Sequence, residues 1–281
     1  MRKVKSSIIK NAVIELCFEA NTEIRKDVLG AFKELSKKQN SVGASKAMVK
    51  ILIENSEIAY KDKIPMCQDT GMVSVFLEIG RHVHVEGETI KEAVNKGVET
   101  AYKKFFLRKS IVKDPILREN TGTNTPAIVH IDIVDGDKVK IDLMPKGFGS
   151  ENKSRLVMLN PTCGRQAIID FCVETVKLAG PDACPPYILG VGIGGAMDSV
   201  TYLAKKALLR PITKKNSKKH IAKIEEDIKK SVNKLNIGVM GLGGEGTVIG
   251  VNVETSATHI AGLPVAVNLS CHALRSASVV I

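Results

Sequence analysis

The 281-residue chain is short of several residue types and patterns, and each shortage argues against a class of protein. It has no tryptophan and only 4% aromatic residues, so few side chains are available to stack on nucleic-acid bases. No uninterrupted apolar run reaches the roughly 20 residues that a membrane-spanning helix needs. No Cys-x-x-Cys pair occurs, which removes the usual signature of zinc ribbons and ferredoxin-type clusters. We therefore expect no nucleic-acid partner and no membrane partner, and any metal site must be assembled from distant parts of the chain.

The formal charge is strongly positive, at +11. The lysines are nevertheless spread along the chain, and the densest group (Lys214, Lys215, Lys218 and Lys219) falls in one polar segment. This pattern is typical of a solvated surface, and it favours the attraction of a small anionic substrate. The basic N-terminus is followed by an amphipathic pattern instead of the apolar core of a signal peptide. We expect a cytoplasmic protein.

Apolar residues recur at helical spacing in the first hundred residues, and segments with strand character follow. Helices are expected around 8–17, over about 22–38, from about 44 onward, and over 88–108, 165–180, 196–209 and 214–235. Strands are expected over 72–79, 127–133, 138–143 and 187–193, and between 248 and 269. Asp135-Gly136-Asp137 predicts a hairpin turn that pairs the strands at 127–133 and 138–143.

This mixture predicts a mixed α/β (α+β) fold, in which a helical N-terminal part packs on a β-sheet core. We expect one large domain over residues 1–281, because no repeat or low-complexity linker divides the chain. The lysine-rich stretch near 212–220 is interpreted as a surface excursion.

Three of the six cysteines lie in polar, loop-like segments beside expected strands. Cys67 and Cys184 each precede a strand, and Cys271 follows one. Loops at strand ends often carry function, and two prolines keep the segment after Cys184 rigid and non-helical. Three thiolates suit an iron–sulfur cube with one iron left open as a Lewis acid. The alternative is three buried, inert thiols.

The other cysteines are weaker candidates. Cys17 and Cys172 fall on the apolar faces of expected helices and are predicted to lie in the core. Cys163 lies in a turn, Asn160-Pro161-Thr162-Cys163-Gly164, and stays open as a rival ligand.

Polar residues close to these cysteines suit a dicarboxylate. Gln68 and Asp69 follow Cys67 directly, and Arg118 opens a polar turn where its guanidinium could clamp a carboxylate. The alternative for Arg118 is a surface ion pair. Glycine runs at 147–149, 190–195 and 241–246 suggest close backbone approach to a small ligand or cluster. The run at 190–195 fits the dinucleotide spacing, but no acidic residue about 20 positions on completes that motif.

Five separated segments together resemble the class I fumarase family, which includes the related L-tartrate dehydratase α subunits. They are Cys67-Gln68-Asp69-Thr70-Gly71, Arg118-x-Asn120-Thr121-Gly122, Lys146-Gly147-x-Gly149-Ser150-x-Asn152-Lys153, Ala183-Cys184-Pro185-Pro186-Tyr187 and His259 through Cys271. The match runs in the family's order from about residue 10 to the last residue.

The resemblance implies a hydro-lyase that interconverts (S)-malate and fumarate, with L(+)-tartrate dehydration as the alternative in the same family. It implies a [4Fe-4S] cluster held by Cys67, Cys184 and Cys271, with the substrate on the fourth iron. A cluster-bearing sensor without turnover is a third interpretation, which the polar residues around the cysteines argue against.

The same resemblance implies that Gln68, Asp69, Arg118, Gly149 and His259 face the small dicarboxylate substrate. Asp69 and His259 would be the catalytic residues, with Asp69 orienting or relaying a proton. Phe148 stands where single-chain members tend to have a third glycine, so the backbone contact could come from Gly147 or from Gly149.

Single-chain members of the family continue into a further domain, whereas this chain stops ten residues after Cys271. The resemblance therefore implies an α subunit whose active site is completed by a β subunit. An (αβ)2 assembly or a similar oligomer is expected.

Overall fold

The computed structural model describes residues 1–37 and 43–281. The single domain expected over the whole chain contains two compact units. The first unit comprises Met1–Arg25, Ser56–Phe148 and Arg275–Ile281, and the second comprises Lys26–Asn55 and Gly149–Leu274. Helix α3 (Gly43–Asp62) and the short helix α5 (Phe148–Glu151) cross from one unit to the other along the chain.

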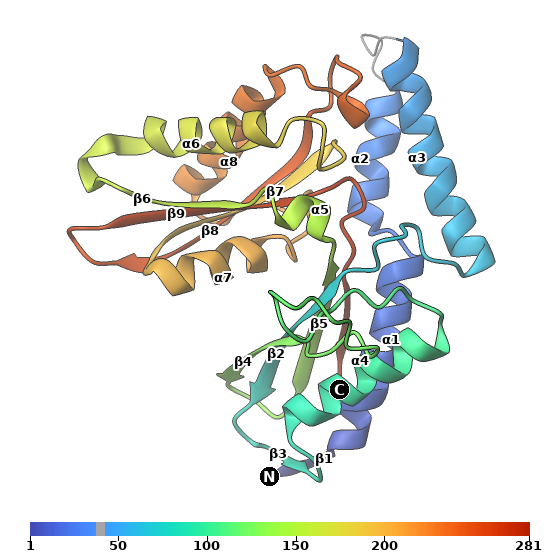
Figure 1. Ribbon diagram of the computed structural model, residues 1–281. Helices are drawn as coiled ribbons and strands as arrows, with labels where there is room; N and C mark the ends of the chain where they lie inside the picture. Colours follow the sequence, from blue (N-terminus) through green and yellow to red (C-terminus); the bar gives the residue numbers. More distant parts are fainter. Residues whose placement is uncertain (38–42) are drawn as a thin grey trace. The chain divides into compact units, whose positions relative to one another are not determined.

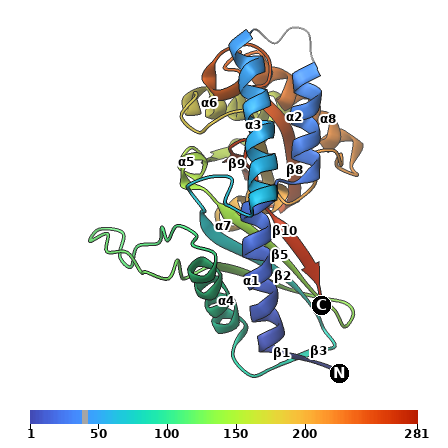
Figure 2. The same ribbon diagram turned by 90° about the vertical axis from the view of Figure 1, so that its right-hand side faces the viewer.

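The first unit is built on a four-stranded sheet with the order β10-β5-β2-β4. Its elements are β1 (Arg2–Lys5), α1 (Ser6–Thr22), β2 (Met72–Gly80), β3 (Val83–Glu86), α4 (Ile90–Lys104), β4 (Ile128–Val134), β5 (Val139–Lys146) and β10 (Ala277–Val280). Apolar side chains of α1, α4, β2 and β5 form one core, in which Val13, Val98, Leu77 and Ile141 are buried. Figure 2 shows α1 and α4 lying beside this sheet.

The predicted hairpin between 127–133 and 138–143 is wrong. Both strands exist, as β4 and β5, but β2 lies between them and pairs with each: parallel to β4 and antiparallel to β5. The Asp135-Gly136-Asp137 turn instead wraps the end of β2, where the amide of His82 donates to the carbonyl of Gly136 at 3.0 Å. Strand β2 takes the central position because nearly all of it is buried, whereas the second half of β4 is exposed.

The second unit is built on another four-stranded sheet, with the order β6-β9-β7-β8. Its elements are α2 (Lys26–Lys37), β6 (Arg155–Leu159), the 3₁₀ turn η1 (Pro161–Cys163), α6 (Gly164–Ala179), β7 (Tyr187–Gly195), α7 (Met197–Ala207), α8 (Lys219–Asn233), the 3₁₀ turn η2 (Val239–Gly241), β8 (Val248–Thr258) and β9 (Leu263–Ser270). Helices α6 and α8 cover one face of the sheet and α7 covers the other (Figure 1).

The mixed α/β fold is confirmed, and most of the expected helices and strands are present. The last position of the helix expected over 22–38 lies outside the described residues. The lysine-rich helix begins at Lys219, not at 214, and one face of it is buried through Ile221, Ile224 and Ile228. Among the described helices, none combines the length and the apolar character that crossing a membrane requires.

The glycine run in β7 serves helix packing, which corrects the suggested approach to a small ligand or cluster. A Cβ on Gly190 would lie 2.1 Å from the carbonyl oxygen of Ala204, and one on Gly192 would lie 2.2 Å from that of Val200. Both carbonyls belong to α7. Because no real Cβ tolerates such distances, the two glycines let α7 pack directly against the middle of the sheet.

Candidate active site

Cys67 and Asp69 lie in a turn of the first unit that is held on both sides. The Asp69 carboxylate accepts two backbone N–H bonds, from Gly71 at 3.0 Å and from Phe148 at 2.9 Å. Gly71 has φ +77°, and a Cβ there would lie 2.8 Å from the backbone of Lys146. The turn therefore packs on the end of β5 in a conformation that favours glycine, and the orientation of the Asp69 carboxylate is set by backbone donors. Cys67 is half-buried and Gln68 is exposed.

A buried cation lies next to this carboxylate, and the sequence did not reveal it. Arg275 is 2% exposed and donates from Nη1 to Oδ1 of Asn21 at 3.0 Å. A Cβ on Gly147 would lie 3.1 Å from Oδ2 of Asp69 and 3.4 Å from Nη2 of Arg275, so the two charges face the same glycine. Arg275 makes no ion pair with any residue that the structure describes, and its Nε is buried without a hydrogen bond.

Tyr102 holds the Cys67–Gly71 turn through hydrogen bonds to its backbone. Its hydroxyl donates to the carbonyl oxygens of Thr70 at 2.6 Å and Gly71 at 3.1 Å. Burial raises the pKa of Tyr102 well above its usual range, while the charge of Arg275 opposes that rise and Asp69 adds to it. The two charged groups therefore both act on this buried hydroxyl.

The loop that carries Arg118 is tied to the same turn. The Thr70 hydroxyl donates to the carbonyl of Arg108 at 2.8 Å, and the Asn124 amide donates to the carbonyl of Gly71 at 3.1 Å. The loop extends away from the end of α4 in Figure 2. Arg118 has φ +64° and is exposed, and its guanidinium makes no hydrogen bond or ion pair with a described residue. The alternative interpretation of Arg118 as half of a surface ion pair is therefore not what the structure shows.

Cys184 and Cys271 come together in the second unit. His272 binds the carbonyl of Cys184 twice, through its backbone N–H at 3.1 Å and through Nδ1 at 3.2 Å. Burial raises the pKa of Tyr187, and Cys184 and Cys271 add to that rise; the Tyr187 hydroxyl donates to the carbonyl of Gly180. Both cysteines are half-buried, and Cys184 has φ +56°.

The segment after Gly149 joins the same end of the second unit's sheet. Asn268, near the end of β9, donates to the Glu151 carboxylate at 2.9 Å. Lys153 donates to Asp182, in the turn before Cys184, at 2.9 Å. Gly149 faces open space, since nothing lies within 4 Å of its Cβ position, whereas Gly147 is crowded by Asp69. Of the two glycines, Gly149 is the one with room beside it for a ligand.

His259 lies elsewhere in the second unit. It occupies the turn between β8 and β9, next to Thr258, which pairs with Gly195 at the end of β7. Cys271 follows the opposite end of β9, where Ser270 pairs with Ile188 at the start of β7. The sheet therefore separates His259 from Cys184 and Cys271 by the length of a strand.

The prediction that Cys17 and Cys172 lie in the core is confirmed. Cys17 and Cys172 are fully buried in α1 and α6, and burial raises the pKa of the Cys172 thiol to about 12 and that of Cys17 further. Cys163 is exposed at the end of η1. Cys67 belongs to the first unit, and the pair Cys184 and Cys271 to the second. Within the described ranges, no three His, Cys, Asp or Glu side chains gather closely enough to hold a metal ion.

Sequence reasoning missed the residues that support these groups. Arg275 and His272 closely follow Cys271, and Asn268 is a buried amide within an apolar strand. The signal for Asn268 was visible, because a polar residue at a core position of a strand must find a hydrogen-bond partner. Nothing in the local pattern marked Arg275, whose partner Asn21 is 254 positions away.

Comparison with known proteins gives consistent matches over nearly the whole chain. A family model described as Fumarate hydratase (Fumerase) matches residues 10–280. The chain is 41% identical over 276 residues to a protein of Methanocaldococcus jannaschii named "Putative L(+)-tartrate dehydratase subunit alpha", and the alignment covers 96% of each chain. It is 31% identical over 258 residues to the L(+)-tartrate dehydratase subunit alpha of Escherichia coli strain UTI89, covering 91% of this chain and 84% of that protein.

Proposed function

The chain belongs to the fumarate hydratase family and is a subunit of a hydro-lyase, and on that premise we propose that it is the cluster-carrying α subunit of an enzyme that interconverts (S)-malate and fumarate. The observation that carries the proposal is that Cys184 and Cys271 lie at the same end of the second unit's sheet. The segment that begins at Gly149 reaches the same end of this sheet.

The thiols fit a [4Fe-4S] cluster. Within the described part of the chain, Cys67, Cys184 and Cys271 form no disulfide and are half-buried in loop segments, whereas Cys17 and Cys172 are buried in helices where ionisation is costly. Thiolates are the usual ligands of such clusters, and three of them leave one iron without a protein ligand. When bound, the cluster supplies a Lewis acid for the substrate's carboxylate and hydroxyl.

The polar residues of the chain supply orientation and proton transfer. Arg118 offers a planar, unengaged guanidinium that suits a carboxylate of the substrate. Asp69 keeps free lone pairs after accepting two backbone N–H bonds, so it can orient the substrate or take up a proton. Gln68 offers an exposed amide, Gly149 gives room for close backbone approach, and His259 is the second catalytic residue of the proposal.

A second substrate has a specific observation in its favour. The relatives described above are named L(+)-tartrate dehydratase subunits. L(+)-Tartrate differs from malate by one hydroxyl, and a site that hydrogen-bonds that hydroxyl discriminates strongly between the two. L(+)-Tartrate dehydration is therefore the alternative function.

We also propose a β subunit that completes the active site, because the relatives carry the name of an α subunit. Dehydration of a dicarboxylate needs a base for the carbon-bound proton and cations for both carboxylates, and the β chain would supply what Gln68, Asp69 and Arg118 do not. The proposed assembly is (αβ)2 or a similar oligomer, in a reducing compartment such as the cytoplasm, where free cysteines persist.

The test is anaerobic reconstitution of the chain together with its β subunit, followed by assays with malate, fumarate and L(+)-tartrate. Turnover of malate and fumarate above that of tartrate is expected, at about four irons per α chain. Cys184→Ser should lower the iron content sharply, because a hydroxyl is a poorer ligand than a thiolate. Cys172→Ser is the matched control and should keep the iron. A Cys184→Ser protein with unchanged iron content would contradict the ligand assignment, and turnover of tartrate alone would select the alternative substrate.

A further inference from the structure

Arg275, in the first unit, is a buried cation whose charge is only partly compensated. It is 2% exposed, and its Nε lies buried without a hydrogen bond. It forms no ion pair with any residue that the structure describes. A buried charge costs free energy unless hydrogen bonds or an opposite charge compensate it. A guanidinium kept in such a place therefore indicates a role beyond filling space.

Asn21, on α1, holds the guanidinium in place. Nη1 of Arg275 donates to Oδ1 of Asn21 at 3.0 Å. The amide of Asn21 is itself fixed, because its Nδ2 donates to the carbonyl of Cys17 at 2.8 Å. The backbone carbonyl of Asn21 accepts the N–H of Met66 at 3.0 Å. Asn21 therefore joins Arg275 to the residue that directly precedes the Cys67–Gly71 turn.

Gly147 leaves room for Arg275 to face the Asp69 carboxylate. A Cβ on Gly147 would lie 3.1 Å from Oδ2 of Asp69 and 3.4 Å from Nη2 of Arg275, so the two groups approach the same point. Opposite charges attract strongly over such a short gap in a buried setting. Oδ2 of Asp69 also accepts the N–H of Phe148 at 2.9 Å, and Oδ1 accepts that of Gly71 at 3.0 Å. Arg275 therefore acts on the oxygen that Phe148 also binds.

We propose that Arg275 is a positioning residue of the active site, whose buried charge, held in place by Asn21, fixes the orientation of the Asp69 carboxylate. The inference rests on the proposed function, since that function gives Asp69 a substrate to orient or a proton to take up. Arg275 does not touch the substrate in this scheme, because its side chain is buried. Its loss should therefore slow the reaction step more than it weakens substrate binding.

Amide hydrogen exchange of the full chain, resolved residue by residue by NMR, tests the proposal without any turnover. In Arg275→Met, the amides of Gly71 and Phe148 should exchange about tenfold faster than in the wild type, because the carboxylate that accepts them is no longer fixed. Arg275→Lys keeps the charge and should recover most of this protection. A lysine variant that exchanges as fast as the methionine variant would overturn the role given to the charge.

Two amides of the neighbouring ladder separate this role from a purely structural one. Arg275 lies two residues before β10, so the alternative is that it only anchors that strand. Val139 and Ile281 report the anchoring, because each donates its N–H to the other's carbonyl, at 2.9 Å and 2.8 Å. An acceleration at Val139 and Ile281 as large as that at Gly71 and Phe148 would overturn the proposal, as would no change at the latter two.

A second variant covers the case in which Arg275→Met does not fold. Asn21→Ala keeps the charge of Arg275 but removes the acceptor that holds its guanidinium. The backbone carbonyl that binds Met66 is unaffected by this change. The amides of Gly71 and Phe148 should again exchange faster, and unchanged exchange there would overturn the proposal.

Kinetics of the assembly reconstituted with the proposed β subunit give the second readout. Arg275→Met should lower kcat about 10²-fold, with KM nearly unchanged, because a displaced catalytic group slows the reaction step. Arg210→Met removes another largely buried arginine, in the second unit, and should leave kcat unchanged. An unchanged kcat in Arg275→Met, or a rise in KM alone, would overturn the positioning role. If the wild-type assembly turns over none of the three diacids, the proposed function fails, and the amide exchange still decides whether Arg275 fixes Asp69.

Discussion

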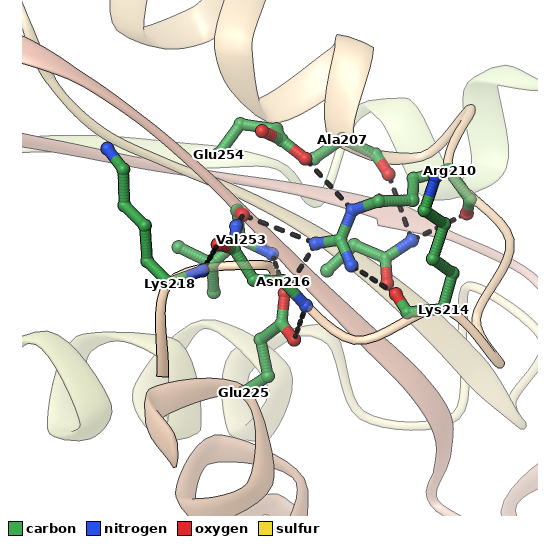
Figure 3. Close-up of polar contacts among 9 residues, drawn as sticks. Ala207, Arg210, Lys214, Asn216, Lys218, Glu225, Val253 and Glu254 are labelled. Carbon is green, nitrogen blue, oxygen red and sulfur yellow. Dashed lines mark hydrogen bonds and ion pairs between the residues drawn. The ribbon is translucent and has the colours of Figure 1, made fainter. Parts of the chain in front are cut away.

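Replacing Arg210 by methionine should remove the cation that neutralises a buried carboxylate in the second unit. The guanidinium forms ion pairs with Glu225 and Glu254, the latter at 2.9 Å, and binds the carbonyl oxygen of Lys214. Its side chain is 14% exposed and that of Glu225 only 7%. Figure 3 shows these groups converging between the segment after α7, helix α8 and strand β8.

The loss of stability depends on how many hydrogen bonds the Glu225 carboxylate keeps after Arg210 is removed. Removing one partner of a buried ion pair costs about 3–5 kcal/mol. Glu225 would still accept the backbone N–H groups of Val253 at 2.9 Å and Asn216 at 3.1 Å, which offsets part of that penalty. We therefore expect Arg210→Met to lower the free energy of unfolding of the second unit by about 3 kcal/mol, at the lower end of that range.

The assay is urea unfolding of the full chain followed by far-UV circular dichroism, because the chain has no tryptophan to report by fluorescence. The matched control is Lys215→Met, which breaks an exposed ion pair with Glu226, a neighbour of Glu225 on α8. The side chains of Lys215 and Glu226 are 72% and 48% exposed. That change should not be measurable, because exposed pairs contribute little to stability.

A double-mutant cycle isolates the pair. Arg210→Met, Glu225→Gln and the double variant should show a coupling of roughly 1–3 kcal/mol, because each single change leaves its partner buried and unpaired. Strictly additive single changes, or a loss in Lys215→Met as large as that in Arg210→Met, would refute the reasoning.

Three other outcomes are expected. Gly192→Ala should lower the free energy of unfolding by about 1–3 kcal/mol, because its Cβ would overlap the Val200 carbonyl and push α7 off the sheet; urea unfolding measures it, and an unchanged midpoint would mean that α7 moves freely. Arg118→Lys should raise the KM of the α–β enzyme with little change in its thermal unfolding, because lysine loses the planar fork; unchanged steady-state constants would exclude Arg118 as the clamp. Brief exposure to air should abolish activity together with iron content, since an iron without a protein ligand is open to oxidation; an air-stable enzyme would argue against an exposed cluster.

Local patterns in the sequence were enough to identify the elements and to sort some of the cysteines. Helical periodicity put Cys17 and Cys172 in the core, and the structure buries both. The same patterns put Cys67, Cys184 and Cys271 in loops, where they are half-buried. Such assignments succeed because burial along one helix or strand follows a short period that neighbouring residues share.

Pairing across the chain was decided only by the tertiary structure. Strand β2 separates β4 from β5 because a buried strand takes the centre of a sheet, and no turn motif encodes which strand that is. Arg275 lies near Asp69 because the chain folds back over about two hundred residues, and its hydrogen bond to Asn21 joins positions that are likewise remote in the sequence. His259 and Cys271 are 12 positions apart in one motif, yet an extended strand holds them at opposite ends of a sheet. Closeness in the sequence could not show this, because a β-strand is nearly fully extended and its two ends are therefore as far apart as that number of residues permits.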